Sequence, residues 1–243
     1  MTKDERMRVS DFEALTFDVY GTLIDWEPHI IAFFRAWAAR NGVEAADPEL
    51  LEQFDRARAH YQQQHPVLPY PEVLRSAYAY ICNHWRKTVD VPEQEAFGAS
   101  VADWQPFPDT VEGLAYLKRH VKLGALSNID DRSLSLSIQK MRVEFDIVVT
   151  AERAGAYKPS YPHFVLALND LGAMGIAPAK LLHVGQSLRA DIRPANSLGI
   201  TSAWIRRAGR TLGSTSHGAE LAVPDATFAT LAELVETHKL ELG

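Results

Sequence analysis

Five polar residues interrupt or directly follow apolar segments of this sequence: Asp18, Ser127, Lys158, Gln186 and Asp191. A carboxylate such as Asp18 can act as a nucleophile and form a covalent intermediate that water later hydrolyses. Such a site needs a cation, which Lys158 could supply, because an opposite charge nearby lowers the pKa of a carboxyl group. We therefore expect Asp18 to be ionised beside Lys158 and to attack an electrophilic carbon or phosphorus atom.

Neighbouring residues could support this chemistry. Thr22 can hold the nucleophilic carboxylate through a hydroxyl hydrogen bond, and Asp191 can anchor Lys158 or orient a water molecule. Ser127, Asn128 and the backbone N–H groups beside them can bind an anionic group of the substrate. Taken singly, each residue has an ordinary structural role as a helix cap or a solvated surface group. The prediction therefore depends on the joint pattern.

The segments that must position these residues alternate between strand-like and helical patterns. Apolar, β-favouring segments predict strands within residues 11–23, 121–126, 145–150, 181–184 and 201–205. Strands that alternate with helices predict an α/β fold with a doubly wound parallel sheet, a Rossmann-type core. Right-handed crossovers place the carboxyl ends of all strands at one edge, where open α/β sheets bind ligands. The polar residues then meet at that edge.

Local signals also predict where several helices of this core begin and end. Residues 109–112 have the spacing of a capping box. Ser160 can cap a helix that has Pro162 in its first turn. A helix that ends at Leu198 should follow residues 185–187, and a last helix should lie near residues 231–240.

The stretch between the first strand and Trp104 is helical in pattern and shows no strand signal. Helices are predicted near residues 28–41, 48–64, 72–86 and 92–101. We therefore expect residues 1–24 and 105–243 to form the α/β core domain and residues 25–104 to form an inserted helical cap domain.

Four short motifs, in this order, resemble those of the haloacid dehalogenase superfamily. DVYGTL at residues 18–23 is similar to its first motif and LSN at residues 126–128 to its second. KP at residues 158–159 is similar to the third, and GQS at residues 185–187, with Asp191, to the fourth. The helical insert after the first motif matches the superfamily's cap domain, and the resemblance covers nearly the whole chain.

Two positions favour one branch of this superfamily. Tyr20 stands where its phosphatases carry a second aspartate as general acid, and Gln186 stands where they carry an aspartate that helps to hold magnesium. Mg²⁺ is usually held by carboxylates together with substrate phosphates. The resemblance is therefore closer to the 2-haloacid dehalogenase branch, which implies an enzyme without a metal ion or other cofactor.

Membership of that branch implies a mechanism like that of (S)-2-haloacid dehalogenases. Asp18 displaces the leaving group at C2 of a small 2-substituted carboxylate, and water then attacks the ester at the Asp18 carboxyl carbon. Ser127 and nearby N–H groups bind the substrate carboxylate. An arginine of the cap holds the leaving group, with Arg56 as the first candidate and Arg58 as the second. Further residues predicted to bind the substrate are Tyr20, Asn128, Gln186 and Ser187.

Other activities stay open. The best-known dehalogenases have two serines and an asparagine in the fourth motif, whereas this chain has Gln186 and Ser187 and lacks the asparagine; a tyrosine of that branch aligns with Phe164. A sub-branch with Gln-Ser or Glu-Ser here includes enzymes that open the ring of azetidine-2-carboxylate. That reaction needs a proton donor, for which His163, His183 or Gln186 could serve. A phosphatase, and a binding protein built on an inactive site, are the remaining alternatives.

Composition limits the class of protein further. The chain has 243 residues, a length that suits one large domain or a domain with an insert. Hydrophobic residues make up 47% of it, which is enough for a sizeable core. A net charge of -6 argues against a nucleic-acid partner. The polar residues 1–10 show no secretory signal and no apolar segment is long enough to cross a bilayer, so we expect a cytoplasmic protein with no membrane partner. A single cysteine, Cys82, excludes an internal disulfide. A homodimer is left open.

Overall fold

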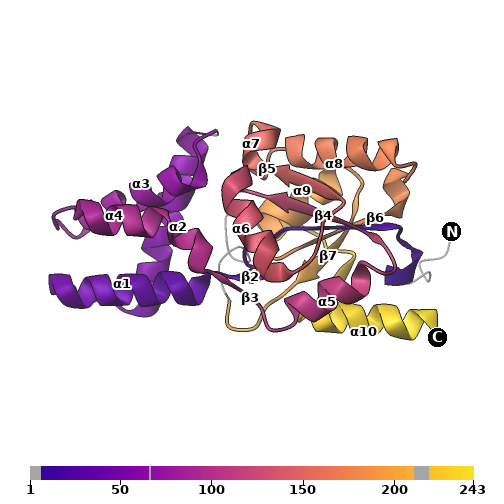
Figure 1. The fold of residues 1–243 in the computed structure, drawn as a ribbon, viewed down its shortest axis with the longest axis horizontal. Coiled ribbons are helices and arrows are strands. Elements are labelled where there is room, and N and C mark those ends of the chain that lie inside the picture. The colour runs from indigo at the N-terminus through magenta and orange to yellow at the C-terminus, as the bar shows by residue number, and fades with distance from the viewer. Residues whose placement is uncertain (1–6, 66, 211–218) are drawn as a thin grey trace.

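Strand β1 (Ala14–Phe17) lies inside a six-stranded parallel sheet, and Asp18 follows it directly. The computed structural model describes residues 7–65, 67–210 and 219–243. Its strand order is β5-β4-β1-β6-β7-β8 (Figure 1). The other strands of this sheet are β4 (Lys122–Ser127), β5 (Ile147–Thr150), β6 (Leu181–Gly185), β7 (Thr201–Ile205) and β8 (Ala226–Phe228). The predicted α/β class is confirmed, and the five predicted strands are present; the three-residue β8 was not predicted.

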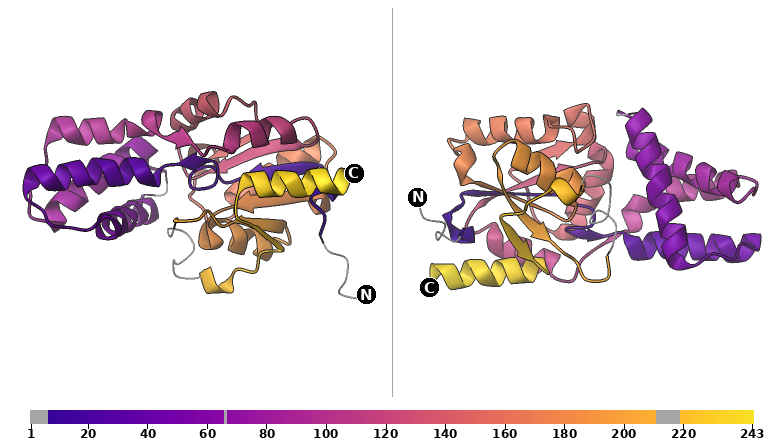
Figure 2. Two further views of the ribbon diagram at one scale, coloured as in Figure 1. Left: turned by 90° about the horizontal axis from the view of Figure 1, so that it is seen from below. Right: turned by 180° about the vertical axis from the view of Figure 1, so that it is seen from behind.

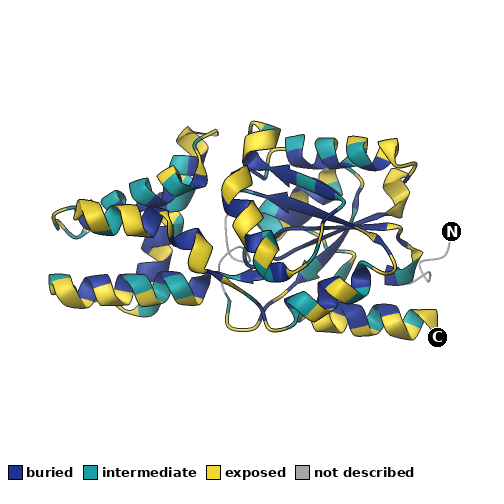
Figure 3. Cartoon of the chain, in the orientation of Figure 1, coloured by how far each residue is buried: buried dark blue, intermediate teal, exposed yellow. Residues whose placement is uncertain are grey.

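Helices cover both faces of the sheet. On one face, α5 (Thr110–Leu117), α6 (Asp131–Met141) and α10 (Leu231–Leu242) contribute Leu114, Leu134 and Leu234 to a core that includes Leu15 and Phe17 of β1. The opposite face is covered by α8 (Pro162–Ala173) and α9 (Arg193–Ser197). A short helix, α7 (Ala151–Ala154), follows β5. Figure 3 shows that burial is concentrated on the strands and on the inner sides of these helices.

The strands are aligned so that their carboxyl ends reach the same edge. Phe17 of β1 is paired with Ala125 of β4 on one side and with Val184 of β6 on the other. The residue after β1 therefore lies level with the last residues of both neighbouring strands. This alignment brings Asp18 beside the ends of β4 and β6.

Four helices form a lobe on one side of the sheet (Figures 1 and 2). They are α1 (Glu27–Asn41), α2 (Asp47–Gln64), α3 (Tyr70–His84) and α4 (Val91–Gly98). The chain enters and leaves the lobe through two antiparallel strands, β2 (Ile24–Asp25) and β3 (Gln105–Pro106). We propose that residues 25–104 form the cap domain, since this pairing marks its two crossings. Residues 1–6 of the expected core segment lie outside the described residues.

Two predicted helix caps are wrong. Helix α5 begins at Thr110, where a helix start was predicted, but Asp109 makes no cap hydrogen bond; its Oδ2 accepts hydrogen bonds from Arg207 and from the backbone N–H of Ala232. Helix α8 begins at Pro162, and Ser160 lies one residue too early to cap it. In the described part of the chain, no helix is both long enough and apolar enough to cross a membrane.

Candidate active site

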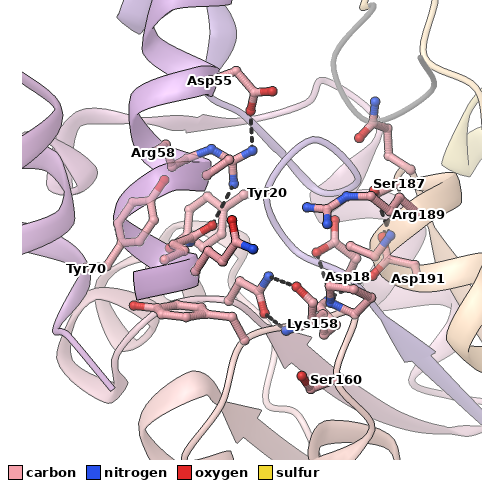
Figure 4. A pocket seen from close by; sticks show the side chains of 18 of the residues that line it. Asp18, Tyr20, Asp55, Arg58, Tyr70, Lys158, Ser160, Ser187, Arg189 and Asp191 are labelled. Carbon is pink, nitrogen blue, oxygen red and sulfur yellow. Dashed lines mark hydrogen bonds and ion pairs between the residues drawn. The ribbon is translucent and has the colours of Figure 1, made fainter. Parts of the chain in front are cut away.

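Lys158 lies at the centre of a buried polar cluster at the carboxyl edge of the sheet (Figure 4). Its Nζ donates hydrogen bonds to Asp18 Oδ1 at 3.0 Å, to Asp191 Oδ1 at 2.7 Å and to the carbonyl oxygen of Leu126 at 2.7 Å. An ammonium group has three N–H donors, so every donor of Lys158 has a partner. The side chain is therefore held in one position between the two carboxylates.

The Asp18 carboxylate has a second support and still faces the pocket. Its Oδ2 accepts a hydrogen bond from the Thr22 hydroxyl at 2.7 Å, and Thr22 Oγ1 accepts one from the Gln186 N–H at 2.9 Å. The side chain of Asp18 is 12% exposed, whereas that of Lys158 is 1% exposed. A ligand in the pocket can therefore reach the carboxylate but not the ammonium group.

Burial raises the pKa of Asp18 to about 6, although the charge of Lys158 and the Thr22 hydrogen bond oppose this change. Lys158 lowers this pKa, as predicted, but burial and the nearby charge of Asp191 raise it by more, so the net change is upward. At neutral pH the carboxylate is still largely ionised.

Asp191 is fully buried beneath Lys158. Its Oδ2 accepts a hydrogen bond from the Ser187 N–H at 3.1 Å, so both carboxylate oxygens have a donor. Burial would raise its pKa, but the charge of Lys158 and the nearby His183 ring lower it to about 2. Gly185 makes room for this side chain, since a Cβ at that position would lie 2.5 Å from Asp191 Cβ.

The turn after β6 differs from the predicted regular helix. Residues Leu188–Ile192 form a π-helical turn, and α9 follows it. Ser187 Oγ accepts a hydrogen bond from the Ala190 N–H at 3.0 Å, so this hydroxyl caps the turn. Ser187 was predicted to bind substrate; it lines the pocket, and its Oγ accepts a backbone hydrogen bond while its O–H can still donate.

The second motif supports Lys158 from the backbone side. Asn128 Nδ2 donates to the Lys158 carbonyl oxygen at 3.0 Å, and Asn128 Oδ1 accepts from the Lys158 N–H at 2.7 Å. Ser127 is fully buried, does not line the pocket, and its hydroxyl has no partner among the described residues. The backbone N–H of Asn128 makes no hydrogen bond within the described ranges and is the group here that could bind a substrate anion.

Tyr20 lines the pocket with its ring rather than with its hydroxyl. The hydroxyl lies 2.7 Å from Ser137 Oγ of α6, and the ring packs edge-on against Trp104 with centroids 5.5 Å apart. Burial raises the pKa of Tyr20, which keeps the phenol neutral. Its contribution to the pocket is therefore an apolar wall.

The arginine of the cap that faces this site is Arg58. Arg56 lies on the outer side of α2, where its side chain is 58% exposed and pairs with Glu52. Residues two apart on a helix point in nearly opposite directions, and Arg58 enters the pocket, paired with Asp55 and 3.4 Å from Gln62 Oε1. The prediction that Arg56 faces the site is wrong, and the second candidate occupies that place.

A cavity of about 600 Å³ joins these groups between the lobe and the sheet. Several lining residues were not predicted from the sequence: Gln62, Gln63, Tyr70, Tyr157 and Arg189. Tyr157 directly precedes the lysine of the third motif, and this neighbourhood could have indicated it. Its hydroxyl donates to the carbonyl oxygen of Leu68, which links the core to the lobe at the pocket wall.

Residues 12–199 match the family model of the haloacid dehalogenase-like hydrolases. The chain belongs to this family. This haloacid dehalogenase-like hydrolase is 25% identical over 217 residues to haloacetate dehalogenase H-2 of Moraxella sp. (strain B), covering 87% of the chain and 93% of that relative. It is also 26% identical over 218 residues to the 5-amino-6-(5-phospho-D-ribitylamino)uracil phosphatase YigB of Escherichia coli (strain K12), covering 79% and 83%.

The fold of this haloacid dehalogenase-like hydrolase is shared with the L-2-haloacid dehalogenase of Xanthobacter autotrophicus. The two structures superpose with a TM-score of 0.76 at 21% identity, covering 94% of this chain and 98% of that one. The curated relatives thus include a dehalogenase and a phosphatase, and the two activities must be distinguished by the chemistry of the site.

The site of this haloacid dehalogenase-like hydrolase does not fit the magnesium ion of the superfamily's phosphatases. Position 186 is a neutral amide in place of a carboxylate, and Asp18 Oδ1 and Asp191 Oδ1 are already paired with the Lys158 ammonium group. Mg²⁺ needs hard oxygen ligands, usually carboxylates. Within the described ranges, no group of three or more His, Cys, Asp or Glu side chains is arranged to hold a metal.

Proposed function

We propose that this haloacid dehalogenase-like hydrolase removes the leaving group from C2 of 2-substituted carboxylates, with Asp18 as nucleophile and no metal ion. The observation that carries this proposal is the charge balance of the site: Lys158 pairs with Asp18 and Asp191, and the neutral side chain of Gln186 adds no further carboxylate to hold a divalent cation. Asp18 is thereby left charge-paired, partly exposed and directed at the pocket.

In the first step, an Asp18 carboxylate oxygen attacks C2 of the substrate. A new C–O bond forms while the carbon–halogen bond breaks, and the halide leaves with the bonding electron pair. Arg58 faces the pocket from α2 and would stabilise the departing halide. The product of this step is an ester between Asp18 and the substrate.

In the second step, water attacks the carboxyl carbon of that ester. The bond between this carbon and the ester oxygen breaks, and the 2-hydroxy acid leaves with one former Asp18 oxygen. Asp18 recovers a carboxylate that contains one oxygen from water, and a proton is released. The Lys158 ammonium, 3.0 Å from Asp18 Oδ1, would stabilise negative charge on the tetrahedral intermediate.

The substrate carboxylate is expected at the end of β4. The side chain of Ser127 is buried, so we assign this role to the backbone N–H of Asn128. A backbone donor at the carboxyl edge of the sheet suits an anion because the neighbouring strand ends direct polar groups there.

The proposal is tested by measuring halide release from chloroacetate and 2-chloropropionate in the presence of a chelator. We expect release that continues with chelator and that is abolished by Asp18→Asn, checked by mass for the absence of deamidation. A single turnover in ¹⁸O-water should place label in the Asp18 carboxylate. No release from any 2-haloacid would refute the proposal.

A phosphatase is the second candidate, because of the similarity to YigB. It predicts magnesium-dependent phosphate release from an aryl phosphate, and the absence of such release at millimolar magnesium would exclude it. Ring opening of a cyclic imino acid has less support. The histidines considered as proton donors, His163 and His183, are fully buried outside the pocket lining, and burial lowers the pKa of both.

A further inference from the structure

Arg189 brings a second guanidinium group into the pocket. It belongs to the π-helical turn Leu188–Ile192 of the core and is half-buried there. Figure 4 shows that Arg58 and Arg189 enter the same pocket from different parts of the protein, one from α2 of the lobe and the other from the core. In the proposed displacement reaction, Arg58 stabilises the leaving halide and Arg189 has no role.

Arg189 differs from the other cations of the pocket because it has no hydrogen bond or ion pair within the part of the chain that the structure describes. Lys158 makes three hydrogen bonds, and Arg58 pairs with Asp55 and with Gln62. Burial lowers the pKa of the Arg189 guanidinium and the like charge of Arg58 acts in the same direction, while the charges of Asp55 and Asp191 oppose this change without forming an ion pair with Arg189. A half-buried cation that is repelled by a neighbour is costly unless an anion joins it.

The pocket also has more room than a two- or three-carbon haloacid needs. Its volume of about 600 Å³ lies in the range that holds much larger ligands. The pocket lining also offers amide groups from Gln62 and Gln63 of α2 and a hydroxyl group from Ser160 of the core. Among these, Gln62 Nε2 is a buried donor without a partner among the described residues.

We infer that Arg189 is a specificity-determining residue that binds a second carboxylate of the substrate, so that the preferred substrates are 2-substituted dicarboxylates. This inference rests on the proposed function for the identity of the reacting centre. A guanidinium fork matches a carboxylate with two parallel hydrogen bonds. A carboxylate suits the site better than a phosphate, since only one pocket cation lacks a partner in the described ranges.

Binding of unreactive acids separates this inference from the chemistry. Succinate and glutarate carry the second carboxylate, while propionate and butyrate lack it, and none has a leaving group. Calorimetry with the unmodified protein should give a dissociation constant about tenfold lower for the best diacid than for its monoacid counterpart. Arg189→Gln should remove this difference and leave monoacid binding within about twofold.

The matched control is Arg193→Gln, which removes an exposed arginine at the start of α9, directly after the π-helical turn, and should retain the diacid preference. If Arg189 only balanced the charge of Asp18 and Asp191, its replacement would weaken monoacids and diacids equally. That result, or equal affinity of diacids and monoacids for the unmodified protein, would overturn the inference. A diacid preference without halide release from any haloacid would leave the subsite standing and refute the proposed reaction.

Discussion

Arg207 donates two hydrogen bonds to the carbonyl oxygen of Thr22, from Nη2 at 2.8 Å and from Nε at 3.3 Å. The hydroxyl of the same Thr22 binds the nucleophilic carboxylate of Asp18 at 2.7 Å. Arg207 is itself fixed by Asp109 at 2.7 Å and packs 4.0 Å from the ring centroid of Phe107. The segment after β7 therefore holds the loop that presents the nucleophile.

We predict that Arg207→Met lowers kcat by about 10- to 100-fold with little change in KM, because a misplaced Asp18 affects the reaction more than substrate binding. The matched control is Arg206→Gln, since Arg206 is exposed and stacks on Trp204. Steady-state kinetics on the best haloacid check this prediction. A kcat within about twofold of the unmodified protein would show that Arg207 only supports the fold.

We predict that Lys158→Met destabilises the protein by ~3–5 kcal/mol, because it leaves two buried carboxylates without their partner. Adding Asp191→Asn should recover part of this loss, since one of the two unpaired charges is then removed. The measurement is the free energy of unfolding in urea. A loss smaller than ~1 kcal/mol would mean that water enters the cluster and solvates both carboxylates.

Activity should decline in acid as Asp18 takes up a proton. With its pKa at about 6, the nucleophile is ionised above this pH and protonated below it, so kcat/KM should fall as the pH drops through this value. Thr22→Val removes a hydrogen bond that favours the ionised form and should move the decline to higher pH, whereas Thr22→Ser should not. A pH–rate profile that Thr22→Val leaves unchanged would contradict this role.

Ionisation of Asp18 should have the opposite effect on folding stability: it increases activity but destabilises the folded protein. The pKa of Asp18 is raised in the folded chain from an ordinary value of 3.8 to about 6. Ionised Asp18 therefore weakens the fold above that pH, and the penalty should disappear as the pH falls from above 6 toward 4. The free energies of unfolding in urea of the unmodified protein and of Asp18→Asn should differ least at the acid end of this pH range. A difference that does not depend on pH would contradict the raised pKa.

Arg58→Gln should reduce halide release by about 100-fold, because the leaving halide loses its cation. Arg56→Gln is the matched control from the same helix and should change the rate by less than about twofold. An equal effect of both variants would show that the net charge of α2, and not the position of Arg58, affects the rate of halide release. Initial rates on 2-chloropropionate provide the measurement.

Much of this fold was predictable from local patterns. Strands such as β1 and β6 are short, apolar and bounded by polar or glycine residues, so their type does not depend on distant contacts. Because parallel strands direct their carboxyl ends to one edge, the meeting of Asp18, Lys158 and Asp191 also followed from the order of elements.

Only the tertiary structure decided which side chains of those segments reach the pocket. The rotation of α2 about its own axis places Arg58 toward the pocket and Arg56 toward solvent. This rotation depends on how the helices of the lobe pack together. The turn after β6 uses Ser187 Oγ as its cap and directs Arg189 into the cavity. Whether the pKa of Asp18 is raised or lowered depends on how far the folded protein shields this carboxylate from water. That shielding is a property of the assembled site and not of the sequence around Asp18.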